Sequence, residues 1–319
     1  MRALVTGGAG FIGSHLAARL VEGGYEVRVL DNFSTGSRSN LVELGDSIDL
    51  IEGDIQSYER AHNAVQGCEV VFHQAALPSV PRSIQDPLTS TAVNVIGTLN
   101  LLLAARDSGV RRVVYASSSS IYGADRTLPK QEDRTPRPIS PYAVAKLASE
   151  GYCRSFSEVY DLETVALRYF NVFGPRQDPQ SQYAAVIPRF ITALLEGKQP
   201  IVFGDGEQSR DFTYIDNVIE ANLLAASAEG ISGEMFNVAC GERISLNRLL
   251  KDLRGIIGIE IDASYLESRP GDVKHSLADI SRAMERLGYQ PKIEFGEGLR
   301  RTVEYLRDAA DRSGSHALS

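Results

Sequence analysis

The sequence predicts an α/β protein built on a doubly wound parallel sheet. Through the first half of the chain, short apolar runs alternate with segments of helical periodicity, and a glycine-rich turn follows the first run directly. Such βαβ alternation is typical of a parallel sheet covered by helices on both faces, with ligands bound at the carboxyl ends of the strands. The expected strands are Arg2–Thr6, Glu26–Leu30, Asp49–Glu52, Glu69–His73, Arg112–Ala116 and Thr164–Leu167, and the expected helices are Ser14–Glu22, Ala61–Gln66, Thr89–Ser108 and Pro141–Val159.

The glycine-rich turn 7–13 indicates a dinucleotide site of the Rossmann type. Gly7 permits the tight turn, Gly10 lets a pyrophosphate approach the backbone, and Gly13 allows the following helix to pack closely on the strand. The free N–H groups of that helix's first turn bind phosphate charge. The spacing is G-x-x-G-x-x-G and differs from G-x-G-x-x-G, so the prediction also depends on the flanking strand and helix.

The second expected strand ends in an acidic residue, Asp31. A carboxylate at this position accepts hydrogen bonds from the adenosine ribose hydroxyls and repels a 2′-phosphate. No arginine follows Asp31 immediately. The expected cofactor is therefore NAD, and NADP is disfavoured.

A second motif, Y-x3-K, opens the helix expected at Pro141–Val159. Ser140 can cap this helix and Pro141 suits its first position, which places Tyr142 and Lys146 one turn apart on one face. A free phenol has a pKa of about 10 and is a poor base at neutral pH. We expect the lysine ammonium and a cationic cofactor ring to lower the pKa of Tyr142, while a serine from the run 117–120 shares the substrate's proton.

Composition narrows the possible partners and the cellular location. The net charge of −8 and the lack of a basic run argue against nucleic acid or an anionic membrane as a partner. Cys68, Cys153 and Cys240 are widely spaced and odd in number, which suits a reducing cytoplasm. We expect no metal site from the scattered histidines, no apolar run of the roughly 20 residues that span a membrane, and no signal peptide before the first strand.

The βαβ rhythm changes after Tyr169. A loop at 174–182 is expected to precede a helix at Val186–Leu195, short strands near Ile201 and Phe212, and further helices to Arg307. We therefore expect a cofactor-binding domain at 1–169 and a smaller α/β substrate-binding lobe at 170–310, with the chain crossing back to the first domain. Residues 311–319 are expected to form a flexible tail.

Taken together, these features resemble the extended short-chain dehydrogenase/reductase family, and within it the nucleotide-sugar 4-epimerases. The resemblance runs from Arg2 to about Arg307 and covers nearly the whole chain. Its motifs, in chain order, are Thr6–Gly13, Asp54-Ile55, His73-Gln74-Ala75-Ala76, Asn94, the serine run, Tyr142/Lys146, Arg168-Tyr169-Phe170-Asn171, Arg210-Asp211 and Arg269-Pro270-Gly271-Asp272.

The resemblance implies roles for the motif residues. Tyr142 would be the acid/base and Lys146 would hold the nicotinamide ribose. Ser118, four residues before Tyr122, is the preferred proton-sharing serine, and Ser119 remains an alternative. The implied cofactor contacts are Gly7, Gly10, Phe11, Ile12, Gly13, Asp31, Asn32, Asp54, Ile55, Ala75, Ala76, Asn94, Tyr142, Lys146 and Tyr169.

It also implies a site for a UDP-sugar. Arginine suits a diphosphate because its planar fork binds two phosphate oxygens at once. Ser276, seven residues after Arg269, matches the position that gates the sugar pocket, where a small residue leaves space for a 2-acetamido group. The implied substrate contacts are Ser79, Ser118, Asn171, Gln177, Ala185, Val186, Phe203, Arg210, Arg269, Asp272 and Ser276.

Several activities of this family remain open. Sugar 4,6-dehydratases carry Asp-Glu at the two positions where this chain has Ser119-Ser120. UDP-glucuronate decarboxylases usually carry Glu where Ser120 stands. Those reactions are disfavoured, whereas a UDP-glucuronate 4-epimerase or another nucleotide-sugar enzyme remains an alternative, and a non-catalytic NAD sensor is a remote one. The preferred function is a homodimeric UDP-hexose 4-epimerase, for UDP-N-acetylglucosamine/UDP-N-acetylgalactosamine and also UDP-glucose/UDP-galactose.

Overall fold

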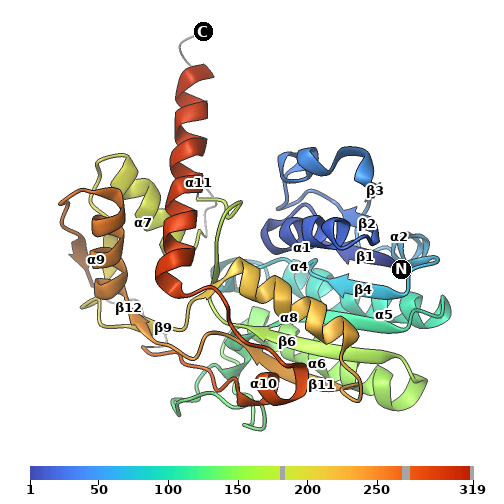
Figure 1. Ribbon diagram of the computed structural model, residues 1–319. Helices are drawn as coiled ribbons and strands as arrows, with labels where there is room; N and C mark the ends of the chain where they lie inside the picture. The colour runs from blue at the N-terminus through green and yellow to red at the C-terminus, as the bar shows by residue number, and fades with distance from the viewer. Residues whose placement is uncertain (180–183, 268–273, 317–319) are drawn as a thin grey trace.

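The computed structural model describes residues 1–179, 184–267 and 274–316. Its centre is a parallel sheet of seven strands in the order β11-β6-β5-β4-β1-β2-β3 (Figure 1). The reversal of strand order beside β1 is typical of a doubly wound sheet. These strands are β1 (Arg2–Thr6), β2 (Glu26–Asp31), β3 (Ile48–Glu52), β4 (Val70–His73), β5 (Arg112–Ser118), β6 (Glu163–Tyr169) and β11 (Glu234–Val238).

Helices cover both faces of this sheet. Side chains alternate between the two faces along each strand: Val5 packs with α1 and α8, whereas Leu4 on the opposite face packs with α2, α5 and α6. The two hydrophobic cores explain why the apolar runs are nearly continuous in sequence. The covering helices are α1 (Phe11–Glu22) and α8 (Ile215–Ser227) on one face, and α2 (Tyr58–Val65), α5 (Gly97–Asp107) and α6 (Pro141–Tyr160) on the other.

Two expected helices differ from the structure in informative ways. α1 begins at Phe11, with Gly10 as its N-cap, and so includes residues that the sequence analysis placed in the turn. The helix expected at Thr89–Ser108 is divided into α4 (Pro87–Thr91), a π-helical turn (Ala92–Ile96) and α5. Hydrophobic periodicity carries no signal for a π turn, because the flanking helical pattern continues through it.

The α4–α5 segment also bears on the expectation that no part of the chain could span a membrane. Pro87–Asp107 is long and apolar enough by length and composition alone, with a mean hydropathy of 1.5. About 44% of its apolar window is buried inside the protein, where Leu101 and Leu102 pack in the core beside α2. The same length and composition occur in core helices, so this feature is weak evidence for a membrane.

Apart from β11, the described strands beyond Tyr169 have only two or three residues each. They pair two at a time: β10 (Thr213–Tyr214) with β7 (Val172–Phe173), β12 (Ile244–Ser245) with β9 (Ser209–Arg210), and β13 (Ser264–Leu266) with β8 (Ile201–Phe203). The remaining elements are α3 (Val80–Gln85), α7 (Val186–Leu195), α9 (Leu246–Ile257), α10 (Ser281–Leu287), α11 (Phe295–His316) and the 3-10 segments Arg38–Ser47 and Ser119–Tyr122.

The second half of the chain is not confined to a separate lobe. α7, α9 and the long α11 form a group beside the sheet (Figure 1), whereas β11 returns to the central sheet and pairs with β6. α8 likewise packs against α1. α11 also continues to His316, into the segment that the sequence analysis expected to be a flexible tail.

Candidate active site

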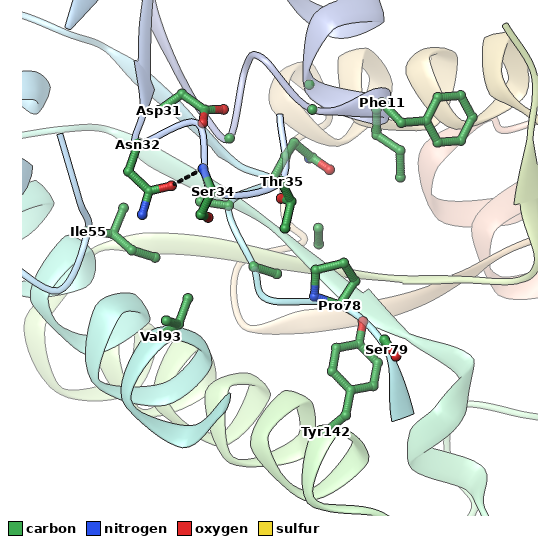
Figure 2. Close-up of a pocket in the computed structure, with 18 of the residues that line it drawn as sticks. Phe11, Asp31, Asn32, Ser34, Thr35, Ile55, Pro78, Ser79, Val93 and Tyr142 are labelled. Carbon is green, nitrogen blue, oxygen red and sulfur yellow. Dashed lines mark hydrogen bonds between the residues drawn. The ribbon is translucent and has the colours of Figure 1, made fainter. Parts of the chain in front are cut away.

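A cavity of about 410 Å³ lies at the carboxyl ends of the central strands and at the N-termini of α1 and α6. Figure 2 shows residues from these elements converging on it. The strand ends gather polar side chains here because all the central strands run in the same direction. Seventeen of the residues proposed from the sequence line this cavity: Gly7, Gly10, Phe11, Ile12, Gly13, Asp31, Asn32, Asp54, Ile55, Ala75, Ala76, Ser79, Tyr142, Lys146, Tyr169, Gln177 and Ala185.

The glycine turn leaves no space for larger residues. A Cβ added at Gly13 would lie 2.1 Å from the carbonyl oxygen of Gly7, and one at Gly7 would lie 2.6 Å from the backbone nitrogen of Ala75. Gly7 also has a φ of 68°, a conformation that favours glycine. Gly10 caps α1 without a side-chain hydrogen bond. The first-turn N–H groups of α1 therefore face the cavity uncovered by a capping side chain, as an anion site requires.

Asp31 lies at the end of β2 and is held in one orientation. Its two carboxylate oxygens accept hydrogen bonds from the N–H groups of Ala9 and Phe33, each at 2.8 Å. Beside it, Asn32 donates to Asp54 Oδ2 at 2.7 Å and accepts from the N–H of Ser34 at 3.0 Å (Figure 2). Since carboxylate oxygens have further lone pairs, this arrangement fits a ribose diol and leaves an unfavourable environment for a 2′-phosphate.

Tyr142 lies at the start of α6 as the sequence predicts. Ser140 accepts a hydrogen bond from the N–H of Ala143, and Pro141 occupies the first turn. The phenol oxygen of Tyr142 points towards Pro78 and Ser79 (Figure 2). The ring is thus presented to the cavity by the N-terminal geometry of the helix.

Burial is the main influence on the pKa values of Tyr142 and Lys146. Burial raises the pKa of Tyr142 to about 12, and a hydrogen bond with Ser118 opposes the increase. Burial also lowers the pKa of Lys146 to about 8, and its ammonium donates to the carbonyl oxygen of Ala116 at 2.7 Å. Among the chain's own groups, desolvation outweighs the ammonium, which lies 5.9 Å from the ring centroid. The expectation that Lys146 and a cationic cofactor ring together lower the pKa of Tyr142 stays a prediction.

The serine run divides between two elements. Ser118 ends β5 and accepts a hydrogen bond from the N–H of Ser120 at 3.2 Å, in addition to its bond with Tyr142. Ser119 begins the following 3-10 turn. Neither is among the described residues that line the cavity, whereas Ser117 is. Contact with the phenol thus distinguishes Ser118 from Ser119.

Asn94, which was expected to contact the cofactor, lies away from the cavity wall. It is buried in the π-helical turn, where its side chain binds both the N–H and the carbonyl oxygen of Leu77, at 2.8 and 3.1 Å. It is not among the described residues that line the cavity. Asn94 therefore holds the loop after β4, and through it the neighbouring Pro78 and Ser79 that do line the cavity.

A second cavity, of about 290 Å³, adjoins the first, and Ala185 lines both. It also contains four further residues proposed for the substrate: Asn171, Val186, Phe203 and Arg210. Asn171 donates to the carbonyl oxygen of Asp211 at 3.0 Å. Arg210 donates to the carbonyl oxygens of Ser209 and Lys274, at 2.9 and 3.2 Å.

Three further residues proposed to bind the substrate are not found among the described residues of either cavity. Ser276 donates its N–H to the carbonyl oxygen of Ser209 at 3.0 Å, which places its backbone beside the segment that carries Arg210. It is not among the described residues that line either cavity. Arg269 and Asp272 lie outside the residues that the structure describes.

The cavities also contain residues that sequence reasoning missed. Ser34 and Thr35 line the first cavity and lie three and four residues after the end of β2, so the rule for strand ends could have identified them. Arg82 lines the same cavity from α3, and Arg189 lines the second from α7. No motif identified these arginines. Across the described parts of the chain, no group of three or more His, Cys, Asp or Glu residues could hold a metal ion.

The fold and the site together are those of a dinucleotide-binding α/β protein whose main cavity is lined by Tyr142 and Lys146. Residues 3–239 match the model of the NAD dependent epimerase/dehydratase family, and the chain belongs to this family. The predicted family, fold class and NAD cofactor are thereby confirmed.

Several relatives match over nearly their whole length. The UDP-glucose 4-epimerase of Mycolicibacterium smegmatis is 40% identical, over 97% of this chain and 99% of the relative. The structure of UDP-N-acetylglucosamine 4-epimerase from Methanobrevibacter ruminantium M1, in complex with UDP-N-acetylmuramic acid, has a TM-score of 0.93 at 41% identity, covering 97% and 98%. UDP-glucuronic acid 4-epimerase from Bacillus cereus, in complex with UDP-glucuronic acid and NAD, has a TM-score of 0.90 at 35% identity, covering 97% and 100%.

Proposed function

We propose that this NAD-dependent UDP-sugar 4-epimerase acts on UDP-N-acetylglucosamine and UDP-N-acetylgalactosamine, and also on UDP-glucose and UDP-galactose. The observation that carries the proposal is the junction of the two cavities, because a cofactor in the first and a UDP-sugar in the second would meet beside Tyr142. Small side chains, Ser79 and Ala185, line the cofactor cavity, and Ala185 lines both cavities. A wall of small residues favours a bulky 2-acetamido group, since overfilling a packed site costs about 1–3 kcal/mol.

Each part of the site has a task in this reaction. Bound NAD supplies the hydride acceptor and a cationic ring that favours the phenolate. Tyr142 takes the proton from the sugar's C4 hydroxyl and later returns it, and Ser118 supports that transfer through its hydrogen bond to the phenol. In the second cavity, Arg210 and Asn171 would bind the diphosphate, and Phe203 would pack against the uracil ring.

UDP-glucuronate is the second candidate substrate, and a specific observation favours it. Arg82 contributes a cationic group to the wall of the first cavity, near Ser79. A guanidinium there suits a C6 carboxylate. Asp178 lines the same cavity, and its carboxylate would repel that of a glucuronate, so the neutral sugars are preferred.

One NMR experiment tests the substrate. Purified enzyme is given UDP-N-acetylglucosamine, UDP-glucose and UDP-glucuronate separately, without added cofactor, and the 4-epimers are measured. We expect activity on the N-acetylated sugar at least equal to that on UDP-glucose. Ser276→Tyr should remove the acetamido activity and leave that on UDP-glucose. A parent that rejects N-acetylated sugars would contradict the proposed specificity. A variant that retains them would show that Ser276 does not gate the sugar pocket.

We also propose that the enzyme is a homodimer. Apolar side chains are exposed along α3, α4–α5 and α6, including Ile84, Leu88, Ile96 and Val144 at 63, 82, 49 and 52%. Apolar patches of this kind are typical of protein interfaces. Sedimentation should give twice the chain mass, and Leu88→Glu together with Val144→Glu should shift it towards the monomer. A parent that sediments as a monomer would exclude this assembly.

A further inference from the structure

The carboxyl end of β5 is joined to one face of α6 by three consecutive residues. Lys146 Nζ donates to the carbonyl oxygen of Ala116 at 2.7 Å. The hydroxyl of Ser117 donates to Glu150 Oε1 at 2.5 Å. The next serine along the strand is hydrogen-bonded to the phenol of Tyr142. Two of these three connections involve the reactive pair, and the third involves a carboxylate with no role in the reaction described so far.

The spacing along α6 explains how these bonds act together. Tyr142, Lys146 and Glu150 follow one another at intervals of four residues, so all three lie on the helix face that packs against β5. A rotation or shift of α6 would therefore break all three connections together. Glu150 lies at the deep end of this row, and its side chain is only 4% exposed.

A buried arginine holds the carboxylate of Glu150 in place. Arg168 donates from Nε to Oε1 at 2.9 Å and from Nη2 to Oε2 at 2.8 Å, and its side chain is 2% exposed. Arg168 lies on β6 directly opposite Ser117 in the strand register. It also donates to the hydroxyl of Tyr122 at 2.9 Å. A bidentate pair fixes direction as well as distance, so Glu150 has one orientation relative to the end of β5.

We propose that Glu150 is a positioning residue for the epimerase reaction, which with Arg168 locks the α6 face carrying Tyr142 and Lys146 against the end of β5. The inference rests on the proposed function, because positioning matters only if Tyr142 transfers a proton. Glu150 is not among the described residues that line either cavity. It acts through Ser117 and the helix, and its negative charge also faces the ammonium of Lys146 from one turn away.

The effect of the Glu150 charge on the pKa of Lys146 can be measured. Burial lowers the pKa of Lys146 to about 8, while the negative charge of Glu150 favours the ammonium. Removing the charge of Glu150 lowers the pKa of Lys146 further. The titratable or charged groups around the two side chains are His73 on β4, Tyr115 on β5, Arg168 on β6, and Tyr142 and Cys153 on α6.

The test variant is Glu150→Gln in the NAD-loaded enzyme, assayed with UDP-glucose and UDP-N-acetylglucosamine. Glutamine keeps the volume and can accept the Ser117 hydrogen bond, but it lacks the charge. We expect kcat to fall on the order of tenfold or more, as for small misplacements of reacting groups, with KM nearly unchanged. The alkaline limb of the kcat–pH profile should move to lower pH. NMR of enzyme labelled with ¹³C at lysine Cε, assigned with Lys146→Arg, should show the same shift without turnover.

A matched control lies at the other end of the same strand pair. Arg112 on β5 is 2% exposed and pairs with Glu163 on β6 at 2.9 Å, far from the reactive face of α6. Glu163→Gln therefore disturbs another buried arginine on these two strands. We expect its thermal midpoint to fall while its kcat–pH profile stays that of the parent.

Two outcomes would overturn the proposal. One is a folded Glu150→Gln enzyme with kcat within twofold of the parent and an unmoved alkaline limb and Lys146 resonance. If Glu150→Gln does not fold, Ser117→Ala decides, since it removes the hydroxyl that joins Glu150 to the strand. Parental kcat across the pH range would then refute positioning. If the parent epimerises none of the UDP-sugars, the proposed function fails, while the NMR shift of Lys146 still tests the contact with Glu150.

Discussion

The two cavities that meet at Ala185 are built from different kinds of structure. The cofactor cavity lies on the ends of long neighbouring strands, and its polar side chains are held by strand ends, helix N-termini and other side chains. The second cavity is bordered by β8 and β9, of three and two residues. There, Asn171 and Arg210 bind backbone carbonyl oxygens of neighbouring segments.

From this difference we expect residues of the first cavity to affect the reaction, and residues of the second cavity to affect the affinity for the UDP-sugar. Regular structure determines where Tyr142, Lys146 and the glycine turn lie, so changes there should affect the reaction and the retention of NAD. Pairing between short segments determines where Asn171 and Arg210 lie, so changes there should mainly affect binding of the UDP-sugar. Four predictions test this division, starting with the largest effect.

The strongest test concerns the acid/base. Tyr142→Phe removes the proton carrier and keeps the ring, so kcat should fall at least ~10²-fold while NAD remains bound. Steady-state rates and the NAD released on denaturation measure the two effects. Tyr160→Phe, at the other end of α6, should behave as the parent. Turnover of Tyr142→Phe within tenfold of the parent would mean that another group moves the proton.

The next test concerns the glycine turn. Gly13→Ala would place a Cβ 2.1 Å from the carbonyl oxygen of Gly7, so we expect the free energy of unfolding to fall by about 1–3 kcal/mol and NAD to be lost on purification. Chemical denaturation and cofactor content measure these effects. Gly255→Ala on α9 is the control, because its added Cβ would meet no atom within 4 Å. If the two variants have equal stability and NAD content, close packing at Gly13 is not required.

In the second cavity the expected effect is on KM. Arg210→Met removes a guanidinium proposed to bind the diphosphate, and KM for the UDP-sugar should rise about tenfold, equivalent to about 1.4 kcal/mol. NAD content and the pH profile should not change. Arg248→Met on α9, whose side chain is 57% exposed, is the control. Loss of NAD from Arg210→Met would contradict the division between the cavities.

The smallest expected effect is on how the free energy of unfolding depends on pH, through a histidine of the cofactor half. His73 at the end of β4 is buried between Thr6 and Thr98, and burial lowers its pKa to about 3. An unfolded histidine has a pKa of about 6.5 and binds a proton first, so stability is lost as the pH falls below 6.5. We expect about 1 kcal/mol of loss from this group by pH 5.5.

Chemical denaturation of the parent and of His73→Gln at pH 7 and 5.5 measures this contribution. The variant should be less stable than the parent at pH 7 but should lose less stability than the parent between pH 7 and 5.5. His275→Gln in the second half is the comparison, since that ring is only partly buried and should change the slope little. Equal slopes for the parent and His73→Gln would show that His73 does not carry the acid sensitivity.

The sequence predicts the cofactor half well because its signals are local. The turn at Gly7, the acidic end of β2 and the Y-x3-K spacing each lie within one element, and the structure brings them to one cavity. The bidentate pair of Arg168 and Glu150 was not predicted, because it joins residues on different elements and leaves no periodic pattern.

In the second half the signals are weaker. Strands of two residues, such as β9 and β12, are too short for alternation to reveal, and their partners lie far along the chain. The helix Val186–Leu195 is predicted at its observed limits because its apolar face is long and periodic. Local patterns therefore predict single elements here but not how those elements meet.

The return of β11 to the central sheet constrains how the protein can be made. Until residues 234–238 are available, β6 has a row of unpaired backbone groups along one edge, and such edges recruit other chains. During synthesis, the first 169 residues leave the ribosome long before their last strand partner does. The central sheet of the cofactor half therefore remains incomplete until much of the substrate half has been translated.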